Sequence, residues 1–218
     1  MRFINRYKLY RKITCNNRWD RIDCRKDTEE NMKSTIADLA SIQTGVHLNP
    51  NSEGDALYLQ AGHFDQQNGS LDPRVRPNVT LDPRQSKHLL LPGDVLFVSK
   101  GVRHFAALYQ SSMGRAVASP IFLVIRLHSH REISPAYLTW YLNHPQTQVR
   151  LHALAKAATV SSLNRQDLSD FEINLPDLSR QNAIVQVDAL RRRESALRRD
   201  LQALRENHIQ KILIQSIR

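Results

Sequence analysis

Short apolar runs separated by polar turns fill the middle of the chain. Runs rich in β-branched and aromatic residues predict buried strands, and the clearest are residues 121–125 ("IFLVI") and 95–98 ("VLFV"). In "HLLLPGDVLFVSKG" the second run follows another apolar run and a Pro-Gly-Asp turn, which favours a hairpin over residues 89–98. Further strands are expected at 171–175 and at 56–60, where a loop and a return give a hairpin-like pattern. Such short strands predict a curled sheet with mixed or antiparallel pairing.

Helical patterns lie before and after these strands. Ser34 is the expected N-cap of a short amphipathic helix that Gly45 ends. Another helix is expected after Ser134, because Pro135 favours the first helical position and Pro145 is a stop. Two shorter helical segments follow, at 146–158 and 164–168. The sequence therefore predicts the α+β class, with short helices around the curled sheet.

The last forty residues read as one long helix. Residues 179–214 contain no Gly or Pro and are rich in Leu, Ala, Arg, Gln and Glu. Their apolar positions recur at seven- and four-residue spacing and form a seam of Leu190, Leu197, Leu201, Leu204 and His208, which is polar at His208 and at Glu194. A single helix cannot bury such a seam, so we expect a partner helix from a second copy, giving a homodimer, or from another subunit. The alternative is that the helix packs back on its own domain.

These patterns divide the chain into three regions. Residues 1–33 form a basic N-terminal extension, 34–178 a globular domain, and 179–218 a long helix for dimerisation and subunit docking. The net charge of +10 suggests a polyanionic partner, and residues 74–131 carry nine Lys/Arg against two Asp. The alternative is a solvated surface of mixed charge. No apolar run is long enough to span a bilayer, and we expect a cytoplasmic protein with no membrane contact.

Motifs for catalysis fail on their spacing. A phosphate-binding loop requires GxxxxGK[ST], but Gly93 lies seven residues before Lys100, and Gly101 follows the lysine. His128 and His130 have no third ligand nearby in the sequence, so surface or DNA-facing histidines are favoured over a metal site. We therefore predict a binding module without catalytic residues, metal or cofactor.

Six fragments, taken in order, resemble a known family. They are "TIADLASIQTG", "LYLQAGHFDQQNGSL", "LLPGDVLFVSKG", "AVASPIFLVIRL", "ISPAYLTWYLNHP" and "VSSLNRQDLSDFEINLPDLSRQNAIV". Followed by a long helix, they are similar to the specificity subunits of type I restriction-modification enzymes. The most diagnostic part is the last, where a strand leads into the long helix through Leu175, Pro176, Leu178, Gln181 and Ile184. With one target-recognition domain and one long helix, the chain looks like a half-size specificity subunit.

The resemblance implies a non-catalytic subunit that reads half of a split sequence in double-stranded DNA. It also implies that the long helix docks methyltransferase (modification) subunits and a restriction subunit. Recognition domains of this family contact DNA through loops, which places weight on basic and polar residues in such loops: Arg74, Arg76, Lys100, Arg103, His104, Lys156 and Asn164. The alternative is an adaptor that assembles a complex through its helix and has lost DNA readout.

Overall fold

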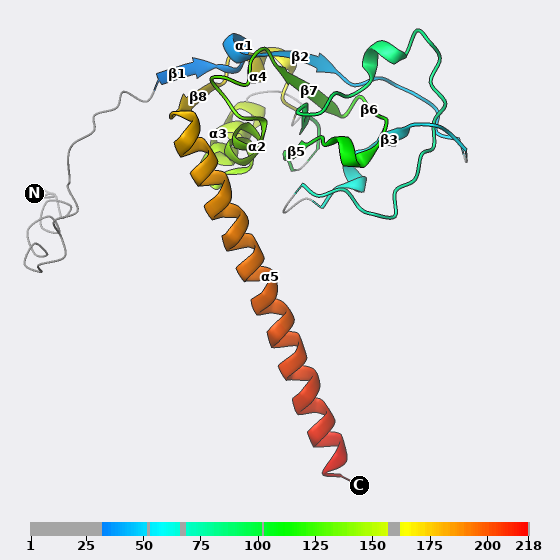
Figure 1. Cartoon of the computed structure of the whole chain (residues 1–218), viewed down its shortest axis with the longest axis vertical. Coiled ribbons are helices and arrows are strands. Elements are labelled where there is room, and N and C mark those ends of the chain that lie inside the picture. The colour runs from blue at the N-terminus through cyan, green and yellow to red at the C-terminus, as the bar shows by residue number, and fades with distance from the viewer. Residues whose placement is uncertain (1–31, 52, 66–68, 102, 157–161, 218) are drawn as a thin grey trace, which may run out of the picture. The chain divides into compact units, whose positions relative to one another are not determined.

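The computed structural model describes residues 32–51, 53–65, 69–101, 103–156 and 162–217 (Figure 1). They belong to one compact unit, Asn31–Arg218. Nearly all of the predicted N-terminal extension lies outside the described residues, but its last two residues, Met32 and Lys33, belong to the first strand.

The unit is of the predicted α+β class. Its strands are β1 (Met32–Thr35), β2 (Ala40–Thr44), β3 (Leu57–Leu59), β4 (Val95–Val98), β5 (Ala106–Leu108), β6 (Ala116–Ala118), β7 (Phe122–Leu127) and β8 (Glu172–Leu175). Its α-helices are α1 (Ile36–Leu39), α2 (Pro135–Asn143), α3 (Pro145–Lys156), α4 (Arg165–Ser169) and α5 (Leu178–Gln215), with short 3-10 helices at Ala61–His63, Ser86–His88 and Ser111–Met113.

A four-stranded antiparallel sheet in the order β2-β7-β4-β5 forms the centre. Strand β4 is buried along its whole length because both faces of the sheet are covered. Val95 and Phe97 belong to the core cluster shared with α2, α3 and α4, while Leu96 and Val98 belong to a second cluster with β3 and β6. The continuous apolar run "VLFV" is thus explained by two-sided burial.

Two smaller strand pairs flank this sheet. Strands β3 and β6 pair in parallel, and β1 pairs antiparallel with β8, with Met32 opposite Leu175. The β1–β8 pair brings the first described strand beside the strand that leads into α5 (Figure 1).

Two hairpin predictions made from the sequence are wrong. Residues 89–91 form no strand, and β4 pairs instead with β5 and β7, which come later in the chain. Similarly, β3 finds its partner in β6 more than fifty residues on, and the predicted return is reduced to a single bridge between Phe64 and Leu71. For β3 a partner distant in sequence replaced the local one, whereas β4 pairs on one side with the nearby β5 and on the other with the distant β7.

The first helix is also shorter than expected. Thr35, not Ser34, is the N-cap: its hydroxyl accepts from the Asp38 amide at 3.3 Å, and the Asp38 carboxylate accepts from the Thr35 amide at 2.9 Å. This capping box supports a single turn, after which residues 40–44 continue as β2 and pair with β7. The remaining predicted helices are confirmed, and Pro145, expected as a stop, also opens α3.

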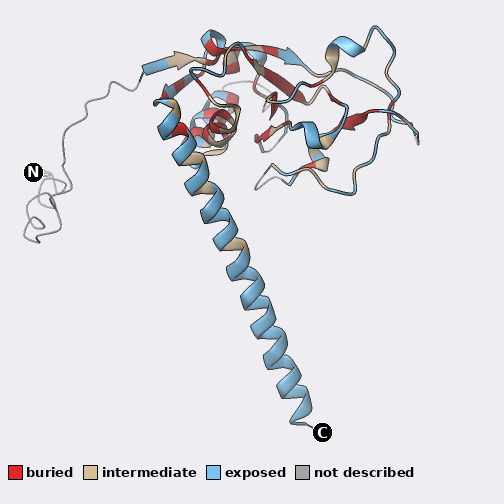
Figure 2. Ribbon diagram, viewed as in Figure 1, coloured by how far each residue is buried: buried red, intermediate tan, exposed pale blue. Residues whose placement is uncertain are grey.

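The long helix is fixed to the domain by a buried glutamine. The side chain of Gln181 is 0% exposed. Its Oε1 accepts from the Ser134 amide at 2.8 Å, and its Nε2 donates to the carbonyls of Glu132 (2.8 Å) and Pro176 (2.9 Å). Burial is confined to the start of α5, and the turns beyond it are exposed (Figure 2).

We expect Gln181→Leu to lower the free energy of unfolding by about 2–3 kcal/mol, because one amide and two carbonyls lose their partner. Urea unfolding followed by circular dichroism measures the change. Gln186→Leu makes the same substitution at an exposed position of α5 and should stay within about 0.5 kcal/mol of the wild type. Equal stability of the two variants would contradict this role for Gln181.

Candidate nucleic-acid interface

The turn before β4 is held by a buried ion pair. Asp94 is 2% exposed, and its carboxylate accepts from the Leu91 amide at 2.7 Å. Arg126 of β7 donates to both carboxylate oxygens, at 2.8 and 2.6 Å, and to the carbonyl of Leu89 at 3.2 Å. Gly93 supplies the positive φ of 96° that this turn requires. "LLLPGD" therefore closes one end of the sheet, and Arg126 is committed to this contact.

Strand β4 is followed by a loop, described at residues 99–101 and 103–104, that is anchored on both sides. The Ser99 amide and hydroxyl donate to the carbonyl of Ile121 at 2.9 and 3.0 Å. The Leu163 amide donates to the Ser99 carbonyl at 2.9 Å, and Lys100 forms a backbone bridge with Ser162. The loop therefore lies beside the segment that starts α4.

Lys100 and Arg103 are the exposed cations of this loop. Neither side chain forms an ion pair with any residue of the described chain. Two exposed positive charges on an anchored loop can meet phosphates without first breaking an internal pair.

His104 does not share this exposure. Its ring is 3% exposed and stacks on Phe97 with ring centroids 6.0 Å apart. Nδ1 lies 2.9 Å from the carbonyl of Val98 and donates to it, and among the described residues Nε2 has no hydrogen-bond partner. Burial lowers the pKa of His104 from its usual value, and the neighbouring ring of His152 acts in the same direction. These contacts argue against a surface contact by His104 and make it the anchor of the loop's second end.

The other predicted residues near this loop are Asn164 and Lys156. Asn164 is the N-cap of α4: its Oδ1 accepts from the Asp167 amide at 2.8 Å, and its own amide donates to the Asp167 carboxylate at 3.1 Å. The cap explains why an Asn stands there, and the residue is exposed close to Ser162, which forms the isolated backbone bridge with Lys100. Lys156 ends α3, but its side chain lies outside the described residues.

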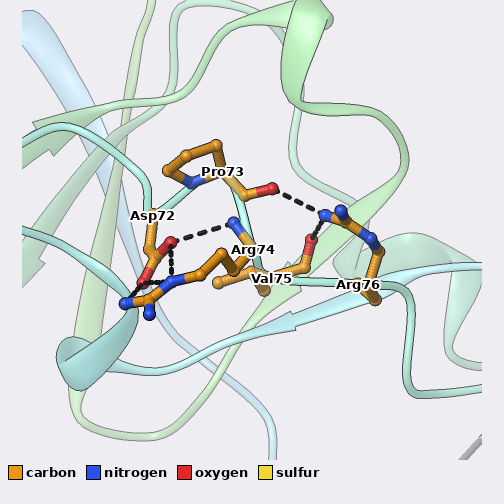
Figure 3. Close-up of polar contacts among 5 residues, drawn as sticks. All are labelled: Asp72, Pro73, Arg74, Val75 and Arg76. Carbon is orange, nitrogen blue, oxygen red and sulfur yellow. Dashed lines mark hydrogen bonds and ion pairs between the residues drawn. The ribbon is translucent and has the colours of Figure 1, made fainter.

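Arg74 and Arg76 lie on a different loop (Figure 3). Arg74 donates to both oxygens of Asp72, with Nη2 at 2.8 Å, and this guanidinium lowers the pKa of Asp72 to about 2. Arg76 donates through Nη1 to the carbonyls of Pro73 (2.6 Å) and Val75 (3.1 Å). Both are exposed, but the charge of Arg74 is already matched by a carboxylate.

The loop of Arg76 borders a large groove at the start of α5. This α5 groove has a volume of about 1320 Å³ and lies between the loops at residues 69–77 and 110–115, helix α2 and the first turns of α5. Its walls include arginines that the sequence analysis did not select: Arg115, Arg180, Arg191 and Arg192. Three of these could have been found from helical spacing, since Arg180 and Arg191 are eleven residues apart on one face and Arg192 is next to Arg191. Arg115 required the fold, because it pairs with Asp55, sixty residues earlier.

The seam predicted on α5 lies on the exposed part of the helix. Leu190, Leu197, Leu201 and Leu204 are between 49% and 67% exposed, and His208 is exposed as well. No helix of the described chain is both long and apolar enough to cross a membrane. An exposed row of leucines on a polar helix is typical of a helix–helix interface.

Comparison with solved structures identifies the fold. The chain resembles a chain from a study of complex assembly and conformational transition in the type I R-M system (TM-score 0.55, 20% identity, 77% of this chain and 40% of that one). It resembles the HsdS subunit from Thermoanaerobacter tengcongensis (0.53, 19%, 77% and 39%) and the type I restriction-modification S subunit from M. genitalium (0.51, 19%, 73% and 38%). The resemblance expected from the sequence is thus confirmed at the level of fold.

The match covers only part of those proteins. It spans about two fifths of each solved chain. No family model and no curated protein matches the sequence.

His104 should make stability depend on pH. Its folded-state pKa lies below the unfolded value of about 6.5, so the unfolded chain takes up the proton first as the pH falls. The stability contributed by the neutral buried ring is complete above about pH 6.5 and is lost as the pH falls towards the folded-state pKa. His104→Asn keeps a donor for Val98 but does not titrate, so its free energy of unfolding should fall less between about pH 8 and about pH 5. Urea unfolding across this range tests it, and parallel curves for the two proteins would contradict it.

Proposed function

We propose that the chain is a non-catalytic DNA-recognition subunit of a type I restriction-modification complex. The observation that carries the proposal is the fold, which resembles S subunits over 73–77% of the chain. The exposed cations on the anchored loop after β4 supply the surface that such a role needs. A subunit that reads chromosomal DNA would work in the cytoplasm.

The globular region, residues 34–178, would read a half-site in double-stranded DNA. We assign the leading contacts to Lys100 and Arg103, because both are exposed and unpaired within the described chain. Arg103 can hold a guanine through two hydrogen bonds, whereas Lys100 suits a phosphate. Asn164 lies beside this loop and is a further candidate.

Arg74 and Arg76 receive a lesser role. Arg74 would have to leave Asp72 before it could bind a phosphate, which offsets part of the gain. Arg76 retains N–H groups beyond the two hydrogen bonds of Nη1, but it borders the α5 groove rather than the loop of Lys100.

Helix α5 would serve as the docking element and spacer of the complex. Its 38 residues are about 57 Å long at 1.5 Å per residue. The exposed seam fits a helix of a methyltransferase or restriction subunit, or a second copy in a homodimer that would restore a two-domain reader.

Lys100→Ala/Arg103→Ala should weaken duplex binding about tenfold or more and reduce the slope of log affinity against log salt by about 2, since two cations are lost. Fluorescence anisotropy with a labelled duplex at several salt concentrations measures both. Arg74→Ala should change affinity less, because Asp72 already neutralises this cation.

Lys211→Ala/Arg205→Ala provides the matched control. It removes two exposed charges from the far end of α5 and should leave affinity within about twofold of the wild type. If the loop variant binds duplex as tightly as the wild type does, Lys100 and Arg103 do not contact DNA. That result would favour the alternative of an adaptor that has lost DNA readout. Binding that falls equally in both variants would indicate a response to net charge alone.

A further inference from the structure

Arg165, the first residue of α4, is a cation that the sequence analysis did not select. Its side chain is exposed and forms no ion pair with any residue of the described chain. The carboxylates of α4 are already engaged within the helix. That of Asp167 accepts from the Asn164 amide at 3.1 Å. That of Asp170 accepts from Gln166 Nε2 at 2.8 and 2.9 Å. Within the described chain, the charge of Arg165 is therefore unmatched.

The helix that Arg165 begins does not explain its presence. The cap of α4 is complete without it, because the side chains of Asn164 and Asp167 each accept from the other's amide. The unpaired N–H groups of a first helical turn favour acidic side chains and disfavour cations. A cation that opposes this local preference indicates a role outside the helix.

The backbone around Arg165 is fixed by the core on both sides. Leu163 and Leu168 are buried, and both belong to the core cluster shared with the central sheet. Helix α4 lies against α1 and β2 (Figure 1). The side chain of Arg165 therefore starts from a well-anchored position.

The segment before α4 is joined to the loop that carries Lys100. The Leu163 amide donates to the Ser99 carbonyl at 2.9 Å, and Lys100 forms an antiparallel bridge with Ser162. The Cα atoms of bridge partners are about 5 Å apart, and three residues extend at most about 11 Å, so those of Lys100 and Arg165 lie within about 16 Å. One DNA strand advances about 3.4 Å per phosphate along its axis, so both side chains can meet the same short stretch of backbone.

We propose that the side chain of Arg165 contacts a DNA phosphate, and that the loop after β4 and the start of α4 form one basic surface for the duplex backbone. The proposal rests on the proposed function in taking DNA as the ligand, and it adds a contact from a second element of the fold. Phosphates are alike in every sequence, so this contact contributes affinity and register and leaves the choice of bases to other residues.

A labelled duplex of arbitrary sequence is the probe, because a phosphate contact does not depend on the bases. Fluorescence anisotropy at several salt concentrations measures affinity. Arg165→Ala should weaken binding about five- to tenfold at about 0.1 M salt and reduce the slope of log affinity against log salt by about 1, since one cation is lost. Arg165→Lys should keep most of the affinity. If the lysine variant binds as weakly as the alanine variant, the guanidinium itself is recognised, which would overturn the assignment to a phosphate.

Arg165→Glu separates binding from folding. Its carboxylate repels phosphates, so the duplex affinity of this variant should fall below that of Arg165→Ala. An acidic residue suits the first turn of a helix, so the midpoint of thermal unfolding should equal or exceed that of the wild type. Circular dichroism measures this midpoint. A lowered midpoint would show that Arg165 supports the fold and would overturn the proposal.

Arg131→Ala is the matched control for the loss of one positive charge. Arg131 is exposed and forms no ion pair with any residue of the described chain. It follows β7, which runs antiparallel to β4, so it lies at the opposite end of the central sheet from Lys100. Its removal should leave affinity within about twofold of the wild type. Equal losses in the two alanine variants would reduce the effect to net charge and overturn the proposal.

The loop variant distinguishes failure of this proposal from failure of the proposed function. If Arg165→Ala binds duplex as tightly as the wild type while Lys100→Ala/Arg103→Ala binds weakly, the assignment of Arg165 is wrong and the proposed function stands. If both variants bind as tightly as the wild type, or the wild type binds no duplex, both proposals are contradicted.

Discussion

The buried carboxamide of Gln181 links helix α5 to the globular domain. It satisfies the first amide of the α2 region and two carbonyls, one of them in the turn between β8 and α5. A buried amide left without partners is costly, so these three bonds favour one direction for the start of α5. Because a helix is a stiff element, this contact, together with the packing of Ile184 and Val185 on the core, sets the direction in which α5 leaves the domain (Figure 1).

The Lys and Arg side chains of residues 74–131 differ in whether a carboxylate already pairs with them. Arg126 is taken up by the buried Asp94, Arg74 and Arg115 are paired with aspartates, and Lys100 and Arg103 stay exposed on an anchored loop. Sequence charge counts treat these residues alike. A cation that must first leave a carboxylate gains less from a phosphate than one that is free, so the tertiary structure ranks residues that composition cannot rank.

On the α5 surface, exposed apolar and charged positions lie side by side. The leucine seam and the apolar part of the groove supply apolar surface area. The hydrophobic effect is non-directional, so this area by itself would accept many helices. Of the arginines beside the seam, Arg191 is paired with Asp188 and Arg198 with Glu194 of the same helix, so part of their charge is already matched. Both features lie on one helix, so a single partner would meet them together.

The sequence by itself determined the elements whose signals are local. The N-caps and prolines of α2, α3 and α4 and the 38-residue run of α5 are set by residues a few positions apart, and the seam follows from the helical period. Only the tertiary structure decided the strand partners, because β4 meets β7 and β3 meets β6 across long stretches of chain. It also decided the site: His104 and Arg103 are neighbours in sequence, but one is buried against Phe97 and the other is exposed. Burial and the pairs Arg126–Asp94 and Arg115–Asp55 depend on contacts between distant segments, which local sequence patterns do not encode.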